Sequence, residues 1–178
     1  MEFQNLIEKR RTVRKYAEGN TVSKEDILAM IKAAQEAPSW KNSQTGRYYC
    51  VMDETDVARF RQECLPEMNA GKCENAVLII STFVHDRAGF QKDGTADNEL
   101  GNGWGCYDLG LQNENLVLKA AELGFGSLIM GIRDAEAIRK MLQIPNEEII
   151  TSVVAIGKTK VIPERNKRKE LDEIMKIY

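Results

Sequence analysis

The feature that most constrains the fold is the segment 76–84, which reads Ala-Val-Leu-Ile-Ile-Ser-Thr-Phe-Val and is apolar almost without interruption. Such a run favours a β-strand, and its continuity predicts a strand covered on both faces. A second long pattern, 107–123, has helical spacing with apolar residues nearly all round, and Gly124 follows it as a residue suited to ending a helix. We expect 107–123 to be the central, buried helix.

Shorter patterns predict the remaining elements. A first helix is expected up to about Arg10, and Ser23 can cap a second helix that stops before Pro38. The expected buried face of the second helix is Ile27, Leu28, Ile31 and Ala34. We also expect strands at 48–52 and 151–157 and a helix from the cap Asp134 to Leu142. The irregular alternation of helices and strands favours the α+β class over a doubly wound sheet.

Length and composition favour one globular domain covering residues 1–178. The 178 residues are 43% hydrophobic and 29% charged, and no repeat or linker-like stretch divides them. A formal net charge of −2 gives no overall attraction to nucleic acid or to an anionic membrane. Four cysteines without C-x-x-C spacing are typical of reduced thiols. With neither a secretory signal nor a membrane-length apolar run, we expect a cytoplasmic protein.

A basic cluster near the N-terminus is the first candidate for binding chemistry. It consists of five cations within seven positions: Lys9, Arg10, Arg11, Arg14 and Lys15. One interpretation is a solvated basic face. The alternative is a site for one phosphate monoester, because Arg can grip phosphate bidentately and the Thr12 hydroxyl lies within the cluster.

Three further segments offer polar or flexible groups. The loop 37–44 carries hydroxyls and amides after a helix and could contact a ligand, although for this stretch alone a simple turn into the next strand is the favoured interpretation. Asn69 and Lys72 are three residues apart and could contact the edge of a polar heterocycle. The glycines of 124–131 are not a dinucleotide fingerprint, and we expect them to let the backbone approach something flat.

Several familiar catalytic motifs are missing from the sequence. It contains no Walker motif, G-x-S-x-G elbow or H-E-x-x-H. His85 is the only histidine, which leaves no His-paired Ser or Cys catalysis and no ordinary zinc site. We therefore expect no metal, and we interpret His85 as structural.

Taken in order, the motifs resemble the nitroreductase family. The resemblance is carried by R-R-T-x-R at 10–14, A-P-S-x-x-N-x-Q at 37–44, N-x-x-K at 69–72, D-L-G at 108–110 with N-L at 115–116, G-F-G-S at 124–127, I-P at 144–145 with Glu148, V-V-A-I-G at 153–157 and R-K-x-L-D-E at 168–173. This chain departs from the family pattern at Thr45-Gly46, where the family has Pro-Trp, and at Glu170, where it has Pro.

The resemblance implies a nitroreductase-like fold, with a mixed or antiparallel central sheet flanked by helices and a C-terminal segment exchanged with the partner subunit of a homodimer. It also implies bound FMN, with NAD(P)H as hydride donor and a nitroaromatic, quinone or similar small acceptor in a ping-pong cycle. Because the flavin would carry the chemistry, no catalytic side chain is expected. An FMN-binding storage or redox-sensing protein is the alternative, and a flavin-free interaction domain is a third hypothesis. The implied cofactor-binding residues are Arg10, Arg11, Thr12, Arg14, Pro38, Ser39, Trp40, Asn42, Asn69, Lys72, Met130, Gly131 and Arg168.

The resemblance further divides these residues between two subunits. Arg10, Thr12 and Arg14, with Arg168 and Lys167, would hold the phosphate and ribityl chain, and Asn69 and Lys72 would face the pyrimidine edge of the flavin. Pro38, Ser39 and Asn42 would come from the other subunit. Spacing agrees, because the helix between the two motifs would span about 20 Å and keep them from meeting over one flavin.

Overall fold

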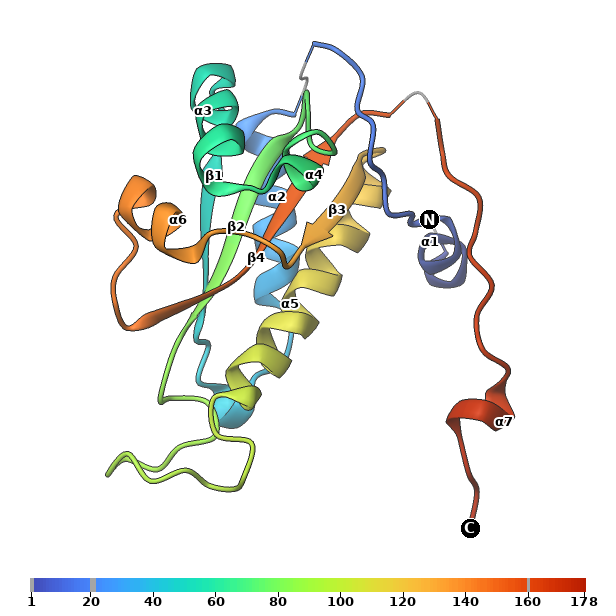
Figure 1. The fold of residues 1–178 in the computed structure, drawn as a ribbon. Coiled ribbons are helices and arrows are strands. Elements are labelled where there is room, and N and C mark those ends of the chain that lie inside the picture. The colour runs from blue at the N-terminus through green and yellow to red at the C-terminus, as the bar shows by residue number, and fades with distance from the viewer. Residues whose placement is uncertain (1, 20–21, 160) are drawn as a thin grey trace.

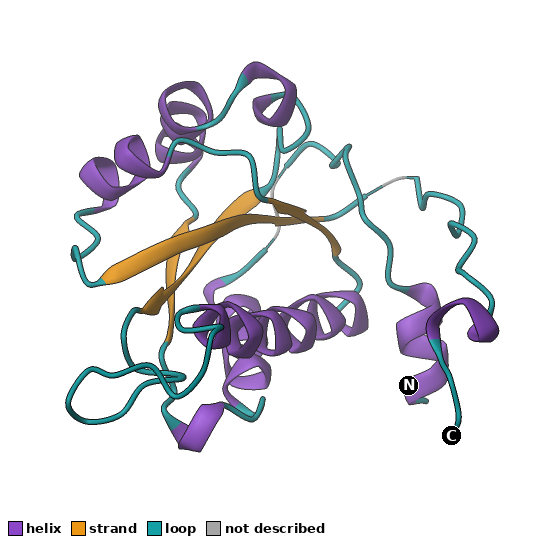
Figure 2. Ribbon diagram, turned by 60° about the horizontal axis from the view of Figure 1, so that its bottom comes forward, coloured by secondary structure: helices purple, strands orange, loops and turns teal. Residues whose placement is uncertain are grey.

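The computed structural model describes residues 2–19, 22–159 and 161–178. Its body has three layers: one sheet in the middle and helices on each of its two faces (Figures 1 and 2). In chain order the elements are α1 (Phe3–Lys9), α2 (Lys24–Gln35), the 3-10 turn η1 (Trp40–Asn42), β1 (Gly46–Val51), α3 (Glu54–Cys64), α4 (Glu67–Ala70), β2 (Val77–Val84), α5 (Gly103–Glu122), β3 (Gly126–Met130), α6 (Ala135–Leu142), β4 (Glu148–Gly157) and α7 (Leu171–Ile174). The α+β class predicted from the sequence is confirmed.

The sheet has the order β1-β2-β4-β3, and each neighbouring pair is antiparallel. Of the mixed and antiparallel alternatives, the sheet is therefore antiparallel. Strand β2 lies inside the sheet, and its side chains alternate between the two faces: Leu78 and Ile80 enter one core, Val77 and Ile79 the other. The predicted strand covered on both faces is confirmed, and only β1 and β3 are left as edge strands.

Helices α2 and α5 cover one face of the sheet, and α3, α4 and α6 cover the other (Figures 1 and 2). Helix α2 begins after the predicted cap Ser23, which forms a capping box with Asp26. Its buried residues are Ile27, Met30 and Ala34. Leu28, expected on the same face, is 49% exposed, because adjacent helical residues point about 100° apart and the buried stripe follows 27, 30 and 34.

Helix α5 packs closely on the sheet and ends as predicted. It begins at Gly103, before the expected start, and a side chain at Gly105 would overlap the ring of Phe83 on β2. Gly124 follows the helix with a φ of 85°, the left-handed conformation expected at its C-terminus. Apolar residues surround the helix less completely than predicted, since Tyr107 lies on an exposed face.

The glycine-rich segment 124–131 contains strand β3, which the sequence did not predict. A Cβ at Gly126 would lie 2.5 Å from Cγ2 of Val13. Glycine at this position therefore leaves room for Val13 of the N-terminal segment, and not for the flat ligand that was expected. Helices α3 and α4, on either side of 65–66, were also not predicted.

The C-terminal arm, which we define as residues 161–178, leaves the body after β4 and carries α7 (Figure 1). Its hydrogen bonds and ion pair after Val161 join residues of the arm to each other. Its apolar side chains are exposed: Val161, Ile162, Leu171, Ile174, Met175, Ile177 and Tyr178. Among the described residues, none of the helices has the length and apolarity that a membrane span needs.

Candidate functional site

The N-terminal basic cluster lies against the start of the edge strand β3. Thr12 forms a parallel bridge with Ser127, and the Val13 N–H donates to the Ser127 carbonyl at 2.8 Å. This pairing fixes the register of residues 12–13 on β3, so the cations on either side project from a defined place on the sheet edge.

The three arginines of the cluster have different surroundings. The Nε of Arg10 lies 3.9 Å from a carboxylate oxygen of Glu114 on α5, and its side chain is only 21% exposed. One guanidinium nitrogen of Arg11 donates to the carbonyls of Glu8 and Arg10, while its Nε is buried with no partner. Arg14 is exposed. Arg10 and Arg14 thus keep donors for an anion, whereas Arg11 is largely used by its own backbone.

The opposite end of β3 carries the second polar group. The side-chain amide of Asn69 donates to the carbonyl of Ile132 at 2.8 Å, and the Lys72 N–H donates to the Asn69 carbonyl at 3.0 Å. Met130 ends β3, and a Cβ added at Gly131 would meet no atom within 4 Å. The structure therefore places Asn69 beside the end of β3, where Asn69 and Met130 are buried and the open space lies at Gly131. Lys72 follows one turn after Asn69.

The separation of these two groups suits one extended ligand. Ser127 and Met130 are three residues apart on β3, which corresponds to about 10 Å at the rise of a strand. An anion held near Thr12 and a polar ring edge held near Asn69 would then be joined along the outer edge of β3, where Ile129 is exposed and the other four residues of the strand are buried. Arg168 is not brought to this edge, because it lies on the exposed C-terminal arm.

The loop 38–44 lies elsewhere, at the start of α5. The Trp40 N–H donates to Oδ2 of Asp108 at 2.8 Å, and the Gln44 N–H donates to the Ser39 hydroxyl at 3.1 Å. Lys41, Asn42 and Gln44 have φ values of 46°, 54° and 48°. Left-handed backbone at a residue other than glycine costs roughly 1–3 kcal/mol, so strong local contacts must hold this loop.

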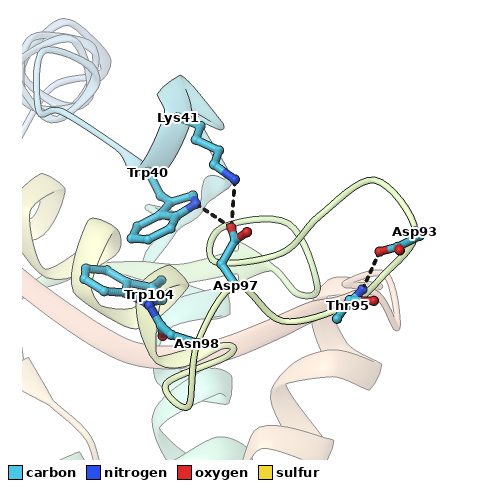
Figure 3. Close-up of polar contacts among 7 residues, drawn as sticks. All are labelled: Trp40, Lys41, Asp93, Thr95, Asp97, Asn98 and Trp104. Carbon is cyan, nitrogen blue, oxygen red and sulfur yellow. Dashed lines mark hydrogen bonds and ion pairs between the residues drawn. The ribbon is translucent and has the colours of Figure 1, made fainter.

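An aromatic and acidic cluster supplies such contacts (Figure 3). The rings of Trp40 and Trp104 lie 4.3 Å apart between centroids. Oδ2 of Asp97 accepts from Trp40 Nε1 at 3.2 Å and from Lys41 Nζ at 2.8 Å. Sequence reasoning missed Asp97 and Trp104, because both contact Trp40 from more than fifty residues away and neither lies in a motif.

The departure from the family pattern at Thr45-Gly46 has a local explanation. A side chain at Gly46 would overlap the carboxamide of Gln112 on α5, which also accepts from the Tyr48 hydroxyl at 3.3 Å. Gln112 therefore occupies the space that a residue larger than glycine would need.

No grouping of three or more His, Cys, Asp or Glu suited to a metal occurs among the described residues.

Asp108 is 3% exposed, and burial raises the pKa of its carboxyl above the ordinary value, opposed by the hydrogen bond from Trp40. A raised pKa means that the folded state favours the protonated form. The stability that Asp108 contributes is therefore fully present below its ordinary pKa and is lost as the pH rises through the raised value.

Asp108→Asn should therefore be more stable than the wild type at pH 7, with an advantage that shrinks toward acidic pH. The asparagine oxygen can still accept from Trp40. Asp108→Leu removes that acceptor and should be less stable than Asp108→Asn by about 1–3 kcal/mol, the cost of a buried unpaired N–H. Urea unfolding at several pH values measures both differences. Equal stabilities of the two variants would contradict the role of Asp108 in holding Trp40.

Comparison with known proteins gives a consistent assignment. The model of the Nitroreductase family matches residues 7–158. A relative from Archaeoglobus fulgidus, provisionally named NADH dehydrogenase/NAD(P)H nitroreductase, is 29% identical over 165 residues, covering 88% of this chain and 84% of the relative. A nitroreductase family protein from Streptococcus pneumoniae has a TM-score of 0.85 at 20% identity, covering 99% of this chain and 100% of that one. A structure described as an oxidoreductase containing FMN has a TM-score of 0.74 at 26% identity, covering 88% and 76% of the two chains. The match of the family model over most of the sequence shows that this chain belongs to the nitroreductase family.

Proposed function

We propose that this protein is an FMN-dependent oxidoreductase that takes hydride from NAD(P)H and reduces nitroaromatics, quinones or similar small electron-poor acceptors in a ping-pong cycle. The observation that carries the proposal is the edge of β3, where Thr12 is bridged to Ser127 and Asn69 is bonded to Ile132. Family membership, the NAD(P)H-linked name of the archaeal relative and the FMN-containing structure support it. The whole chain would act as one flavin-binding domain, and its free cysteines agree with a cytoplasmic location.

The residues along β3 fit FMN by their chemistry. Arg10, Thr12 and Arg14 offer the fork-shaped cations and hydroxyl that bind a phosphate monoester. Lys72 would offer an ammonium to a pyrimidine edge, and its side chain has no hydrogen-bond or ion-pair partner among the described residues. Asn69 is buried with its NH2 group bonded to Ile132, so it would offer its amide oxygen. The backbone at Gly131, directly after the buried Met130, leaves room for a flat ring beside it.

The protein's own residues would bind, orient and polarise, while FMN when bound supplies the hydride-accepting and electron-donating chemistry. Lys72 would place a positive charge at the pyrimidine edge, where a preorganised cation stabilises negative charge. Met130 and Gly131 would lie along one face of the flavin ring. The other face would stay open to nicotinamide and then to the acceptor. No side chain is required as an acid or base.

We also propose a homodimer in which each flavin site uses both subunits. Within one chain, Trp40 is bound to Asp108 near the start of α5, whereas Thr12 is bridged to Ser127 beyond its end. Along α5, Asp108 lies about 9 Å from Glu114, which Arg10 contacts, and about 21 Å from Glu122, near the end that Ser127 follows. Pro38, Ser39, Trp40 and Asn42 would therefore cover the flavin of the partner, and the exposed C-terminal arm would be exchanged onto that partner and bring Arg168 with it.

The purified protein should be yellow, and its flavin should bleach when NADH or NADPH is added without oxygen and regain colour with a quinone or nitroaromatic. Flavin released by heat should run as FMN on chromatography, because one compact phosphate cluster and no dinucleotide fingerprint fit a monophosphate. Recovery of FAD, or a colourless protein that binds no added FMN, would contradict the proposal. Colour that never bleaches with either nucleotide would indicate storage or sensing of FMN.

A further inference from the structure

The loop 38–44 keeps a backbone that its own residues disfavour. Three of its residues, none of them glycine, are left-handed, and such conformations persist only where surrounding contacts determine them. Ser39 and Asp108 bind two backbone N–H groups of this loop. Among the described residues, the side chains of Trp40 and Lys41 form their hydrogen bonds with neither of these two residues but with another partner.

That partner is the segment 85–102, which follows β2 and contributes two adjacent acceptors. Asp97 accepts from the indole N–H of Trp40 at 3.2 Å, and Asn98 accepts from that of Trp104 at 2.8 Å (Figure 3). The two rings are in contact, so neighbouring residues of one segment orient both halves of the tryptophan pair. Asp97 also binds the ammonium of Lys41 at 2.8 Å, and that ammonium lies 5.8 Å from the Trp40 ring centroid.

Asp97 is well suited to holding both groups. Its side chain is largely covered, whereas that of Lys41 is largely exposed. The same Oδ2 serves an indole and an ammonium, and a carboxylate accepts both more strongly than a neutral oxygen would. The segment is itself fastened, because the Asp97 N–H donates to the Gly89 carbonyl at 2.7 Å and Asn102 donates to Asp86 at 2.9 Å.

We infer that Asp97 is a positioning residue for cofactor and acceptor binding: it fixes Trp40 and Lys41 and thereby holds the 38–42 loop in the shape that covers the partner's flavin. The inference rests on the proposed function. The segment 85–102, which contains none of the family motifs, would thus determine how firmly the 38–42 loop is held over the flavin. Because Asp97 acts through Trp40 and Lys41, its loss should affect binding more than the hydride step.

The test compares Asp97→Ala with Asp93→Ala, a matched control on the same segment. Asp93 accepts only from Thr95 at the tip of the segment and does not reach the tryptophans (Figure 3). Asp97→Ala should raise the FMN dissociation constant and the acceptor KM roughly tenfold, in line with the loss of a hydrogen bond to a charged group. The rate of anaerobic flavin reduction at saturating NADH or NADPH should change less than about twofold. Asp93→Ala should match the wild type in all of these.

Two further readouts separate positioning from a merely structural role. Trp40 and Trp104 are the only tryptophans, so the circular dichroism couplet of the pair reports their arrangement with or without flavin. Asp97→Ala should shrink the couplet. Asp97→Asn should be intermediate in couplet, FMN affinity and KM, since its oxygen can accept from Trp40 but it lacks the charge that holds Lys41.

The outcomes distinguish failure of this inference from failure of the proposed function. A wild-type protein that binds no FMN overturns the proposed function, while the couplet still decides whether Asp97 orders the tryptophans. If the wild type binds FMN and Asp97→Ala keeps its affinity and acceptor KM, the positioning role is refuted, whatever happens to the couplet. Equal effects of Asp93→Ala and Asp97→Ala would also overturn it.

Discussion

Arg10→Ala should weaken FMN binding by roughly 10- to 150-fold, the equivalent of about 1.5–3 kcal/mol for a hydrogen bond to a charged group. The expectation is large because the Arg10 side chain is only partly exposed and is aligned by Glu114 on the rigid helix α5. A cation that is already oriented loses little further freedom when it grips a phosphate. Titration of the apoprotein with FMN, followed by quenching of flavin fluorescence, measures the change.

Two variants show whether Arg10 acts by its position or only by its charge. Lys15→Ala removes the same charge from an exposed residue of the same basic cluster and should leave the affinity within about twofold. Arg10→Lys keeps the charge without the bidentate fork and should fall between Arg10→Ala and the wild type. Equal losses in Arg10→Ala and Lys15→Ala would mean that the cluster only attracts the flavin by its overall charge.

Ending the chain at Asp172 should abolish the dimer and the bound flavin together. The truncation removes Ile174, Met175, Ile177 and Tyr178, all exposed in one chain, with Ile177 at 86%. Burying an apolar side chain of this size stabilises an interface by about 1.5–3 kcal/mol. An obligate dimer depends on its interface for stability, so losing these side chains should dissociate it. Light scattering and flavin absorbance on the same sample follow both properties.

The truncated chain should keep its secondary structure apart from α7, because among the described residues the C-terminal arm forms no hydrogen bond to the body beyond Val161. Far-ultraviolet circular dichroism checks this. The full-length double variant Ile174→Ser with Ile177→Ser should also lose dimer and flavin, which excludes an effect of chain length alone. A truncated monomer that retains full FMN occupancy would refute the shared site without affecting the family assignment.

Local patterns in the sequence were sufficient for the elements that are long or strongly capped. Strand β2 and helix α5 were predicted because each carries more apolar residues than a half-buried element would. In β2 these residues form an uninterrupted run, and in α5 they recur over a long stretch at helical spacing. Strand β3 was missed because five residues beginning with glycine give too short a pattern. The exposed Leu28 shows a related limit of local patterns. A helix with several apolar residues has more than one apolar stripe, and the sequence alone does not determine which stripe packs on the sheet.

For the candidate site, the sequence by itself determined the kinds of group available: paired arginines with a threonine, an amide with a lysine, and a polar loop after a helix. These are properties of short segments, so residue types and spacing suffice to find them. Only the tertiary structure decided that Thr12 and Asn69 meet opposite ends of β3 and that the loop of Trp40 lies at the far end of α5. It alone revealed Asp97 beneath Trp40 and Lys41, because a contact between residues more than fifty positions apart depends on how the layers pack and leaves no periodicity in the sequence.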